Sequence, residues 1–433
     1  MRHHGPVSEP IAVPQHCPSP RELDDLELLT HGALGLAAFE GPNGPVTLHV
    51  PPPVAAAAAA AGSLELVDPE GLPLARVTVE ATYEAGAATG ITGPVTALTH
   101  HQFGAFRRLY LSPSEVADRY DGRTLTVPVA AALTDGDLDR IRAAARDRPV
   151  LLLALAGTGT PQDLSVPGLI RATLAAARHL DDASVVAVPL ASRGDATADH
   201  ALGERVVDAY APGEVLGVTS EGELPDDVAE IVDRDRPAPE DQGLVLFFTG
   251  LSGSGKSTLA RALHDLLLEQ GLRTVTSLDG DVVRRNLSAG LTFSKADRET
   301  NIRRIGWVAA EISRHGGVAI CSPIAPFDTT RKQVRVMAEE AGGAFVLVHV
   351  ATPLEECERR DRKGLYAKAR RGEIPEFTGI SSPYEEPEDA AVRVDTTGRT
   401  IEDALSDVLA HLYDAGYLAD RPVEPVESPG GTP

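Results

Sequence analysis

A run of glycines that ends in a lysine and two hydroxyl residues is the clearest chemical signal in this sequence. Residues 244–258 read LVLFFTGLSGSGKST, in which an apolar stretch breaks into the pattern G-x-x-x-x-G-K-[ST]. Glycines let successive backbone N–H groups turn inward around a phosphate, and the N-terminal end of the following helix adds partial positive charge. The alternative, a glycine-rich turn that binds nothing, does not account for a lysine and hydroxyl groups at this spacing. We therefore predict a nucleotide phosphate cradle formed by Gly250, Ser252, Gly253, Ser254, Gly255, Lys256, Ser257 and Thr258.

Two acidic residues follow the next apolar segment and complete a candidate catalytic centre. Asp279 and Asp281 lie in LDGD, where a parallel sheet would present its site at the carboxyl end of a strand. One carboxylate can hold or orient Mg²⁺ while the other accepts a proton from an attacking hydroxyl, and a solvated acidic turn is the alternative. In the cradle, Lys256 would reach the β- and γ-phosphates. We predict Lys256, Asp279 and Asp281 as catalytic residues, and Ser257 and Asp279 as ligands of Mg²⁺.

The apolar runs around this centre alternate with helical patterns. Such alternation predicts an α/β fold, in which a parallel sheet is covered by helices on both faces and binds ligands at the carboxyl ends of its strands. We assign this P-loop domain to residues 243–418. Its expected strands are 244–248, TVTSLDGD, VAICSPI and 344–350. Its expected helices extend from the cradle to Gly271, through the arginine-rich stretch to His315, and over 401–412.

Charge and composition limit the partners of this 433-residue chain. A net charge of −23 argues against nucleic acids and anionic membranes, because both are polyanions. Residues 243–418 hold 22 basic and 25 acidic side chains, so this arginine-rich part is nearly neutral and suits an anionic substrate. Cys17, Cys321 and Cys357 are scattered and show neither zinc-site nor disulfide spacing. With no apolar leader and no membrane-length apolar run, we expect a cytoplasmic protein.

The region before the P-loop domain is predicted to contain two smaller folded parts. Residues 64–83 have two β-type runs around a D-P-E-G turn, which predicts a hairpin, and Ser114 is placed to cap a short helix. Residues 51–62, PPPVAAAAAAAG, favour a low-complexity loop over a short helix. The expected divisions are a flexible tail at 1–25, a β-rich part at 26–120, an α/β part at 121–224, a charged linker at 225–242 and a flexible tail at 419–433.

Two histidine pairs could suggest catalysis or metal binding, but we assign neither role to them. Adjacent residues on a strand point to opposite faces, so His100 and His101 could not both enter one site. A pair such as His3 and His4 in a polar tail is usually incidental.

In the α/β part, helices are expected at 135–146, 167–180 and 201–211, and strands at 149–156, 184–191 and 214–218.

Residues 244–418 resemble adenylyl-sulfate kinase (APS kinase), a P-loop enzyme that phosphorylates the 3′-hydroxyl of adenosine 5′-phosphosulfate (APS) to give PAPS. The resemblance implies a P-loop kinase fold, ATP and APS as substrates, and Mg²⁺ as cofactor. It rests on the cradle and on four further blocks in the family's order, of which the last is highly specific: LDGDVVRRNL, GLTFSKADRETNIRR, SPIAPF and CERRDRKGLYAKARRGEIPEFTGISSPYEEP.

The same resemblance implies the substrate contacts. Phe293 and Phe377 would stack on the two faces of the APS adenine, while guanidinium groups hold its phosphosulfate. Residues 363–377 would form a mobile lid over ATP and APS. Lys363, Arg359 and Arg360 could then meet phosphate charge as the lid closes. The resemblance assigns Arg360 to ATP binding, and Arg284, Phe293, Arg298, Asn301, Ile324, Lys363 and Phe377 to APS binding.

Two stretches depart from the family pattern. The family's ISPY-R reads IAPFD here, so Ala325 replaces a serine and Asp328 replaces a basic residue. The family's GLN-x-DLGFS reads NLSAGLTFS over 286–294. Neither change removes the catalytic lysine, the acids or the aromatic groups, so they bear on substrate affinity rather than on kinase activity.

Residues 63–218 resemble ATP sulfurylase, the enzyme that makes APS, through GPVTALTHHQFGAFRRLYLSPSE and GTGTPQDLSVPGLIRATLAAARHL. That family's Q-x-R-N-P-x-H and G-R-D-H blocks are absent, and with them the groups that would hold ATP phosphates and orient sulfate. We expect an APS kinase behind a degenerate sulfurylase-like region, acting as a homodimer, with a separate active ATP sulfurylase as a candidate partner. The alternatives are a bifunctional sulfurylase and kinase, another small-molecule P-loop kinase, and a regulatory subunit that senses nucleotides.

Overall fold

The computed structural model describes residues 13–99, 104–161, 163–219, 221–292, 294–361 and 363–418, apart from the side chain of Asp281. The chain divides into two compact units, Met1–Asp235 and Arg236–Pro433. No helix among the described residues is both long and apolar enough to cross a bilayer. Several residues singled out above lie outside the described ranges: His3, His4, His100, His101 and Phe293.

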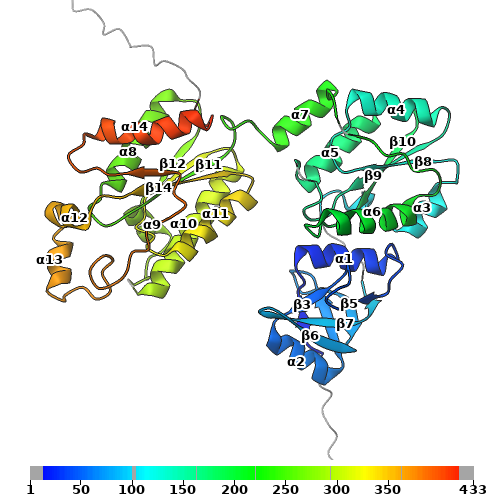
Figure 1. Ribbon diagram of the computed structural model, residues 1–433, viewed down its shortest axis with the longest axis horizontal. Coiled ribbons are helices and arrows are strands. Elements are labelled where there is room, and N and C mark those ends of the chain that lie inside the picture. Colours follow the sequence, from blue (N-terminus) through cyan, green and yellow to red (C-terminus); the bar gives the residue numbers. More distant parts are fainter. Residues whose placement is uncertain are drawn as a thin grey trace, which may run out of the picture. The chain divides into compact units, whose positions relative to one another are not determined.

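The N-terminal unit begins with a β-rich part, drawn in blue in Figure 1. Its sheet has the order β1-β4-β5-β7-β2, and β3 and β6 also pair with β7. The antiparallel pairing of β4 with β5 confirms the hairpin predicted around the D-P-E-G turn. The strands are β1 (Gln15–His16), β2 (Ala38–Phe39), β3 (Leu48–Val50), β4 (Ser63–Val67), β5 (Pro73–Thr78), β6 (Ala81–Ala85) and β7 (Ala88–Ala97).

Three predictions for this part are wrong. The alanine-rich segment is a helix, α2 (Pro52–Ala61), because alanine has the highest helix propensity, proline is tolerated in the first turn and Gly62 ends the helix in the left-handed region. The predicted tail at 1–25 contains β1 and the start of α1 (Pro20–Thr30), whose capping box begins at Ser19. Helix α3 (Pro113–Arg119) is capped by Ser112 rather than by Ser114.

The rest of the N-terminal unit is an α/β part with a parallel sheet of order β10-β9-β8. The expected strand at 214–218 is only a single bridge at Val215. Helix α7 occupies most of the predicted linker, because Val228 is buried and Asp235 accepts hydrogen bonds from the backbone N–H and hydroxyl of Ser165. The elements are η1 (Arg107–Leu109), β8 (Leu125–Val129), α4 (Asp135–Ala145), β9 (Val150–Leu155), α5 (Val166–Ala177), β10 (Ala183–Val188), α6 (Ala196–Tyr210) and α7 (Asp226–Asp235).

The C-terminal unit is built on a parallel sheet of order β12-β13-β11-β14-β15, with the strand that leads into the cradle, β11, at its centre. This confirms the predicted doubly covered parallel sheet. The strands are β11 (Leu244–Thr249), β12 (Val275–Leu278), β13 (Val318–Cys321), β14 (Ala344–Val350) and β15 (Val392–Val394), of which the short β15 was not predicted.

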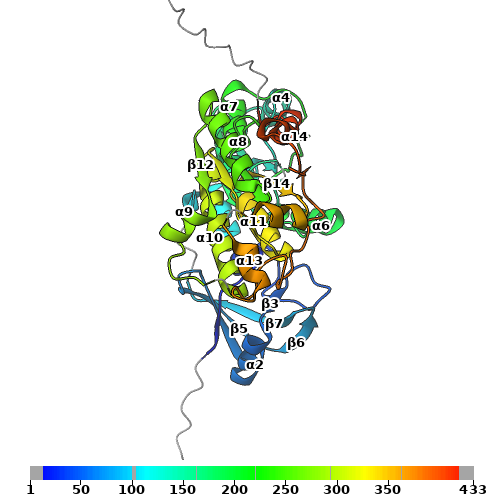
Figure 2. The ribbon, with the colours of Figure 1, turned by 90° about the vertical axis from the view of Figure 1, so that its left-hand side faces the viewer.

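Helices cover both faces of this sheet. Helices α8 (Lys256–Gln270) and α14 (Ile401–Asp414) lie on one side, and α10 (Lys295–Arg314) and α11 (Asp328–Glu340) lie on the other (Figure 1). Alternate residues of β11 therefore enter two separate apolar cores, and all of its side chains are buried. Three short helices remain among the described residues of this unit, α9 (Gly280–Asn286), α12 (Leu354–Arg360) and α13 (Leu365–Arg370), of which α13 faces the viewer in Figure 2.

Candidate active site

The glycine-rich loop between β11 and α8 has a backbone that other residues could not adopt. Gly250 has φ 150°, and a Cβ atom there would lie 2.5 Å from the carbonyl oxygen of Val350. Gly255, the residue before α8, has φ 101° and packs against Thr396. The glycines predicted from the motif are therefore required by backbone conformation and by close packing. The loop ends at the N-terminal end of a 15-residue helix, which favours an anion.

Lys256 opens α8 and is almost fully buried. Its Nζ donates a hydrogen bond to the carbonyl oxygen of Leu251, 2.9 Å away in the same loop. Burial lowers the pKa of Lys256 from 10.5 to about 8, and the charge of Lys363 adds to this, whereas Asp279 and Cys357 act in the opposite direction. The predicted lysine and the first predicted acid are therefore close enough for their charges to interact.

Ser257 and Asp279 line the same cavity, which has a volume of about 240 Å³. The hydroxyl of Ser322, just after β13, donates a hydrogen bond to Oδ2 of Asp279 at 3.1 Å. Asp281 lies within α9, and its side chain is outside the described part of the structure. The remaining residues of the cavity wall are Ala260, Arg261, His264, Asp265 and Ser277.

The oxygen atoms around this cavity fit Mg²⁺. No group of three or more His, Cys, Asp or Glu residues that could hold a metal occurs among the described residues. Mg²⁺ does not need such a group, because it is usually held by one or two protein oxygens together with substrate phosphates and water. One hydroxyl and one carboxylate, from Ser257 and Asp279, provide hard oxygen ligands of this kind.

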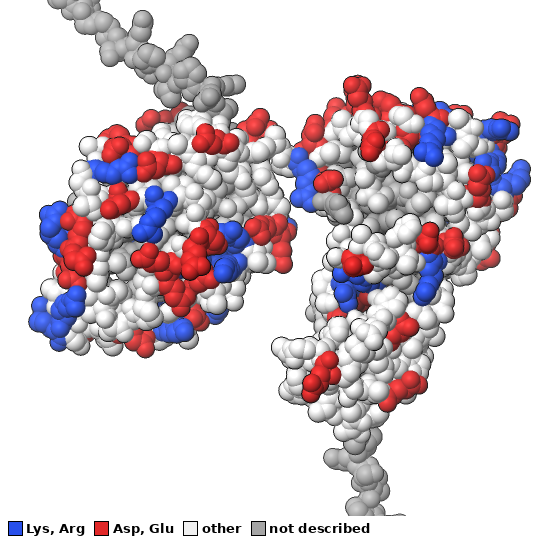
Figure 3. Space-filling view, viewed as in Figure 1, with Lys and Arg blue, Asp and Glu red and all other residues white. Residues whose placement is uncertain are grey.

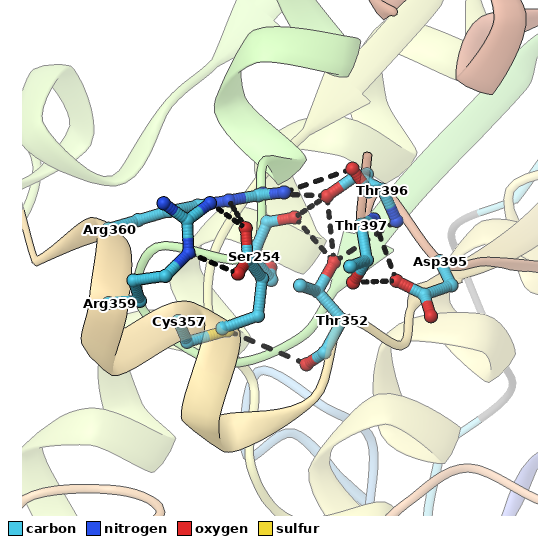
Figure 4. Close-up of polar contacts among 9 residues, drawn as sticks. Ser254, Thr352, Cys357, Arg359, Arg360, Asp395, Thr396 and Thr397 are labelled. Atoms are coloured by element: carbon cyan, nitrogen blue, oxygen red, sulfur yellow. Dashed lines mark hydrogen bonds and ion pairs between the residues drawn. The ribbon is translucent and has the colours of Figure 1, made fainter. Parts of the chain in front are cut away.

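A network of hydrogen bonds that involves two threonine hydroxyl groups holds the backbone of the cradle (Figure 4). Thr352, after β14, and Thr396, after β15, each donate a hydrogen bond of 2.9 Å to the carbonyl oxygen of Ser254. Arg360 donates to both the hydroxyl and the carbonyl oxygen of Thr396, at 2.7 and 2.9 Å, and also to Glu356. The arginine predicted to bind ATP is therefore connected, through Thr396, to the backbone of the cradle.

Thr352 and Thr396 are not among the predicted site residues. Thr352 follows a predicted strand, so the tendency of parallel sheets to place sites at strand ends could have drawn attention to it. Thr396 follows β15, whose three residues carry too little periodicity to be recognised as a strand.

The predicted APS residues on α10 lie on one helical face, three positions apart. Arg298 donates hydrogen bonds to the hydroxyls of Thr378 and Ser382, at 3.0 and 3.2 Å, and its guanidinium lies 5.6 Å from the ring centre of Phe327. Asn301 is buried. The Nε atom of Arg298 and Oδ1 of Asn301 are buried and have no hydrogen-bond partner in the part of the chain that the structure describes. Such atoms are suited to contact a bound molecule.

The predicted lid and its neighbours are placed as follows. Phe377 is half-buried and meets the ring of Tyr366 edge to face at 5.1 Å, and the Tyr366 hydroxyl donates to the carbonyl oxygen of Ser252. Lys363 is exposed, and its charge is felt by Lys256. Arg284 donates to the carbonyl oxygen of Leu291 at 3.5 Å, Ile324 accepts from the Thr249 hydroxyl at 2.6 Å, and Arg359 forms an ion pair with Glu356.

The two departures from the family pattern also have structural consequences. Ala325 is buried and has φ 45°, a left-handed conformation that is uncommon for alanine. Its carbonyl oxygen accepts a hydrogen bond from the fully buried Arg331 at 2.9 Å. Asp328 pairs with Arg331 and with Lys332, so this acid compensates a buried guanidinium. On the face drawn in Figure 3, acidic and basic side chains are interspersed over the surface.

Comparison with known proteins identifies a family for part of the C-terminal unit. A family model described as adenylylsulphate kinase matches residues 242–395. Proteins named sulfate adenylyltransferase from Neosartorya fischeri and Aspergillus fumigatus are each 47% identical to this chain over 192 residues, which are 44% of this chain and 33% of theirs. The chain therefore spans about a third of the length of these curated relatives.

Among solved structures, the hexameric APS kinase from Thiobacillus denitrificans has a TM-score of 0.71 and 27% identity, and the match covers 95% of both chains. The Mycobacterium tuberculosis APS kinase in complex with AMPPNP and APS is 44% identical, and the match covers 40% of this chain and 98% of that chain, with a TM-score of 0.38. The family match spans the cradle, Asp279, Arg298 and Phe377. Residues 242–395 therefore belong to the adenylylsulphate kinase family.

Proposed function

We propose that this chain is an adenylyl-sulfate kinase, which transfers the γ-phosphoryl group of ATP to the 3′-hydroxyl of APS and releases ADP and PAPS. The observation that carries the proposal is the placement of Lys256, Ser257 and Asp279 around one strand-end centre, in a stretch that belongs to the APS kinase family. The half-buried Arg298 and the buried Asn301 on α10 each have one buried polar atom without a hydrogen-bond partner among the described residues, which supports a second substrate beside the ATP cradle.

The residues divide the chemistry as follows. Lys256 exchanges its hydrogen bond to Leu251 for the β- and γ-phosphates, and the N-terminal end of α8 adds positive charge there. The 3′-oxygen of APS forms a bond to the γ-phosphorus as the bond from that phosphorus to the β,γ-bridging oxygen breaks. Of Asp279 and Asp281, one carboxylate accepts the 3′-hydroxyl proton. Ser257 and Asp279 would hold Mg²⁺, which supplies neutralising charge to the phosphates when bound.

The N-terminal unit is proposed to serve assembly or regulation and to have lost APS synthesis. The support is the absence of the two sulfurylase blocks from residues 63–218. The bifunctional alternative has a specific observation in its favour, since the relatives from N. fischeri and A. fumigatus are named sulfate adenylyltransferase. Against it, the T. denitrificans protein, which matches both units, is described as an APS kinase.

The oligomeric state is also a proposal. We retain the homodimer expected from the resemblance, with a separate ATP sulfurylase as a candidate partner. Because the T. denitrificans protein is described as hexameric, a larger assembly is the alternative, and light scattering of the purified full chain distinguishes the two masses. A cytoplasmic location is likewise proposed, in keeping with three free cysteines.

A coupled assay of ADP release tests the proposed reaction. The purified full chain is given Mg²⁺ and ATP with APS, with sulfate, or with other adenosine nucleotides. We expect ADP release, accompanied by PAPS, only in the sample that contains APS together with Mg²⁺ and ATP. Turnover of a different nucleotide would indicate another small-molecule kinase, and tight binding of APS without turnover would indicate a nucleotide-sensing subunit.

A further inference from the structure

The segment that carries Phe377 is a compact turn of its own, and we call residues 376–382 the clamp segment. The carbonyl oxygen of Phe377 accepts hydrogen bonds from the backbone N–H groups of Ile380, Ser381 and Ser382, at 3.1, 3.0 and 3.0 Å. The N–H of Phe377 donates to the Ser381 hydroxyl at 2.8 Å. These bonds fix the backbone of Phe377 relative to the turn, but they do not attach the turn to the rest of the molecule.

The attachment is made by one arginine of α10. Arg298 donates from Nη1 to the Thr378 hydroxyl at 3.0 Å and from Nη2 to the Ser382 hydroxyl at 3.2 Å, and lies 3.8 Å from the carboxylate of Glu376. Thr378 is 5% exposed, so its hydroxyl has little access to water. On the other side the guanidinium lies near the ring of Phe327. Arg298 thus lies between the buried ring of Phe327 and the clamp segment.

The clamp segment also packs against the phosphate cradle. Gly379 has φ 88°, and a Cβ atom there would lie 3.0 Å from a methyl group of Leu251, which is part of the cradle loop. Glu376 has φ 54°, a conformation that costs free energy for a residue other than glycine and that the surroundings must hold in place. A segment with a strained entry needs its tertiary contacts, and the only side-chain hydrogen bonds from α10 to it, among the described residues, come from Arg298.

We propose that Thr378 is a positioning residue of the acceptor site, whose hydroxyl anchors the clamp segment to Arg298 and so holds Phe377 in the orientation that stacks on the adenine of APS. The proposal rests on the proposed function. A ring held in its binding orientation loses less conformational entropy when the ligand arrives, so the contact lowers the KM for APS. It does not act on the γ-phosphoryl group, so the KM for ATP is largely independent of it.

Three variants test this role by steady-state kinetics of the full chain. Thr378→Val keeps the shape of the side chain and removes only the hydroxyl, and should raise the KM for APS by roughly 10-fold, as expected for a lost hydrogen bond to a charged group, with little change in the KM for ATP. Thr378→Ser restores a hydroxyl and should return the KM for APS close to wild type. Thr300→Val is the matched control, because Thr300 accepts a bond from Arg303 at 3.1 Å that does not reach the clamp segment.

A second measurement needs no substrate and separates this proposal from the proposed function. Amide hydrogen exchange in the free protein should be faster at residues 379–382 in Thr378→Val than in wild type, and unchanged there in Thr300→Val. If wild type does not phosphorylate APS, the proposed function fails, while the exchange data still decide whether Thr378 anchors the clamp segment.

The proposal is overturned if exchange at 379–382 is unchanged in Thr378→Val, or if that variant raises the KM values for APS and ATP equally. Should Thr378→Val not fold, Ser382→Ala removes the second, half-buried hydroxyl that accepts a hydrogen bond from Arg298, and is expected to give a smaller change of the same kind.

Discussion

The ammonium group of Lys256 is hydrogen-bonded to the carbonyl oxygen of Leu251, 2.9 Å away, within the loop that should hold the nucleotide. In the protein without ligand, this buried charge is therefore satisfied by the cradle itself. Burial lowers its pKa to about 8, so keeping it charged at neutral pH reduces the stability of the folded state.

Replacing this lysine by an apolar residue should stabilise the free protein. At pH 7, Lys256→Met is expected to have a higher Tm than wild type, since it removes a buried charge. Between about pH 8 and 10.5 the unfolded wild type binds more protons than the folded form, so the stability of wild type rises with pH and the gap closes. The difference between the pKa of Lys256 in the unfolded and folded forms corresponds to about 3 kcal/mol of unfolding free energy. Thermal melts of both proteins from pH 7 to 10 check this, and a gap that does not vary with pH would contradict it.

The proposed catalytic roles predict large losses of turnover. Lys256→Ala and Asp279→Ala should each lower kcat by roughly 10²-fold or more, because transition-state charge and the proton of the attacking hydroxyl lose their partners. The rate of ADP release at saturating ATP and APS is the measurement. Asp389→Ala, which breaks a surface pair with Arg335, is the matched control and should leave kcat unchanged. Near-normal kcat in a folded variant at either site would show that the residue is not catalytic.

The proposed stacking of Phe377 on the adenine of APS predicts a selective change in substrate affinity. Stacking on a base is worth about 1–3 kcal/mol, so Phe377→Ala should raise the KM for APS by roughly 5- to 150-fold. The KM for ATP should change much less, and Phe377→Trp, which keeps a stacking surface, should retain most of the affinity. Equal increases for both substrates in the alanine variant would argue against a role in stacking.

If another protein makes APS, this chain should form PAPS from APS but not from sulfate. The full chain supplied with ATP, Mg²⁺, sulfate and pyrophosphatase should form no PAPS, whereas the same chain supplied with APS should form it readily. The physical reason is the loss of the groups that would stabilise adenylyl transfer. PAPS formed from sulfate, and lost on deletion of residues 1–225, would instead support the bifunctional alternative.

The sequence predicts this protein's structure correctly where the structure is decided by local pattern. The cradle lies in one continuous stretch, in which glycines, lysine and hydroxyl groups follow each other at fixed spacing, so its geometry is encoded by neighbours in the chain. The parallel sheet was likewise predictable, because β11 and β14 are predominantly apolar strands between helical patterns.

The sequence-based predictions were wrong for two segments that tertiary packing holds as helices. The alanine run at 52–61 lacks the periodicity of an amphipathic helix, yet Ala55 and Ala58 are buried and the segment is helical. Helix α7 lies in a charged, proline-containing stretch that is typical of a linker, and it is held by contacts of Val228 and Asp235 with the α/β part.

By itself, the sequence determined the nucleotide cradle, the fold class and the family of the C-terminal unit, because each of these depends on short-range spacing. Only the tertiary structure decided how the site is held together. The bond from Thr396 to Ser254 joins residues 142 positions apart, and the bond from Arg298 to Thr378 joins residues 80 positions apart. No local propensity records such pairs, since the hydroxyl and its partner meet only after the strands and helices that carry them have packed.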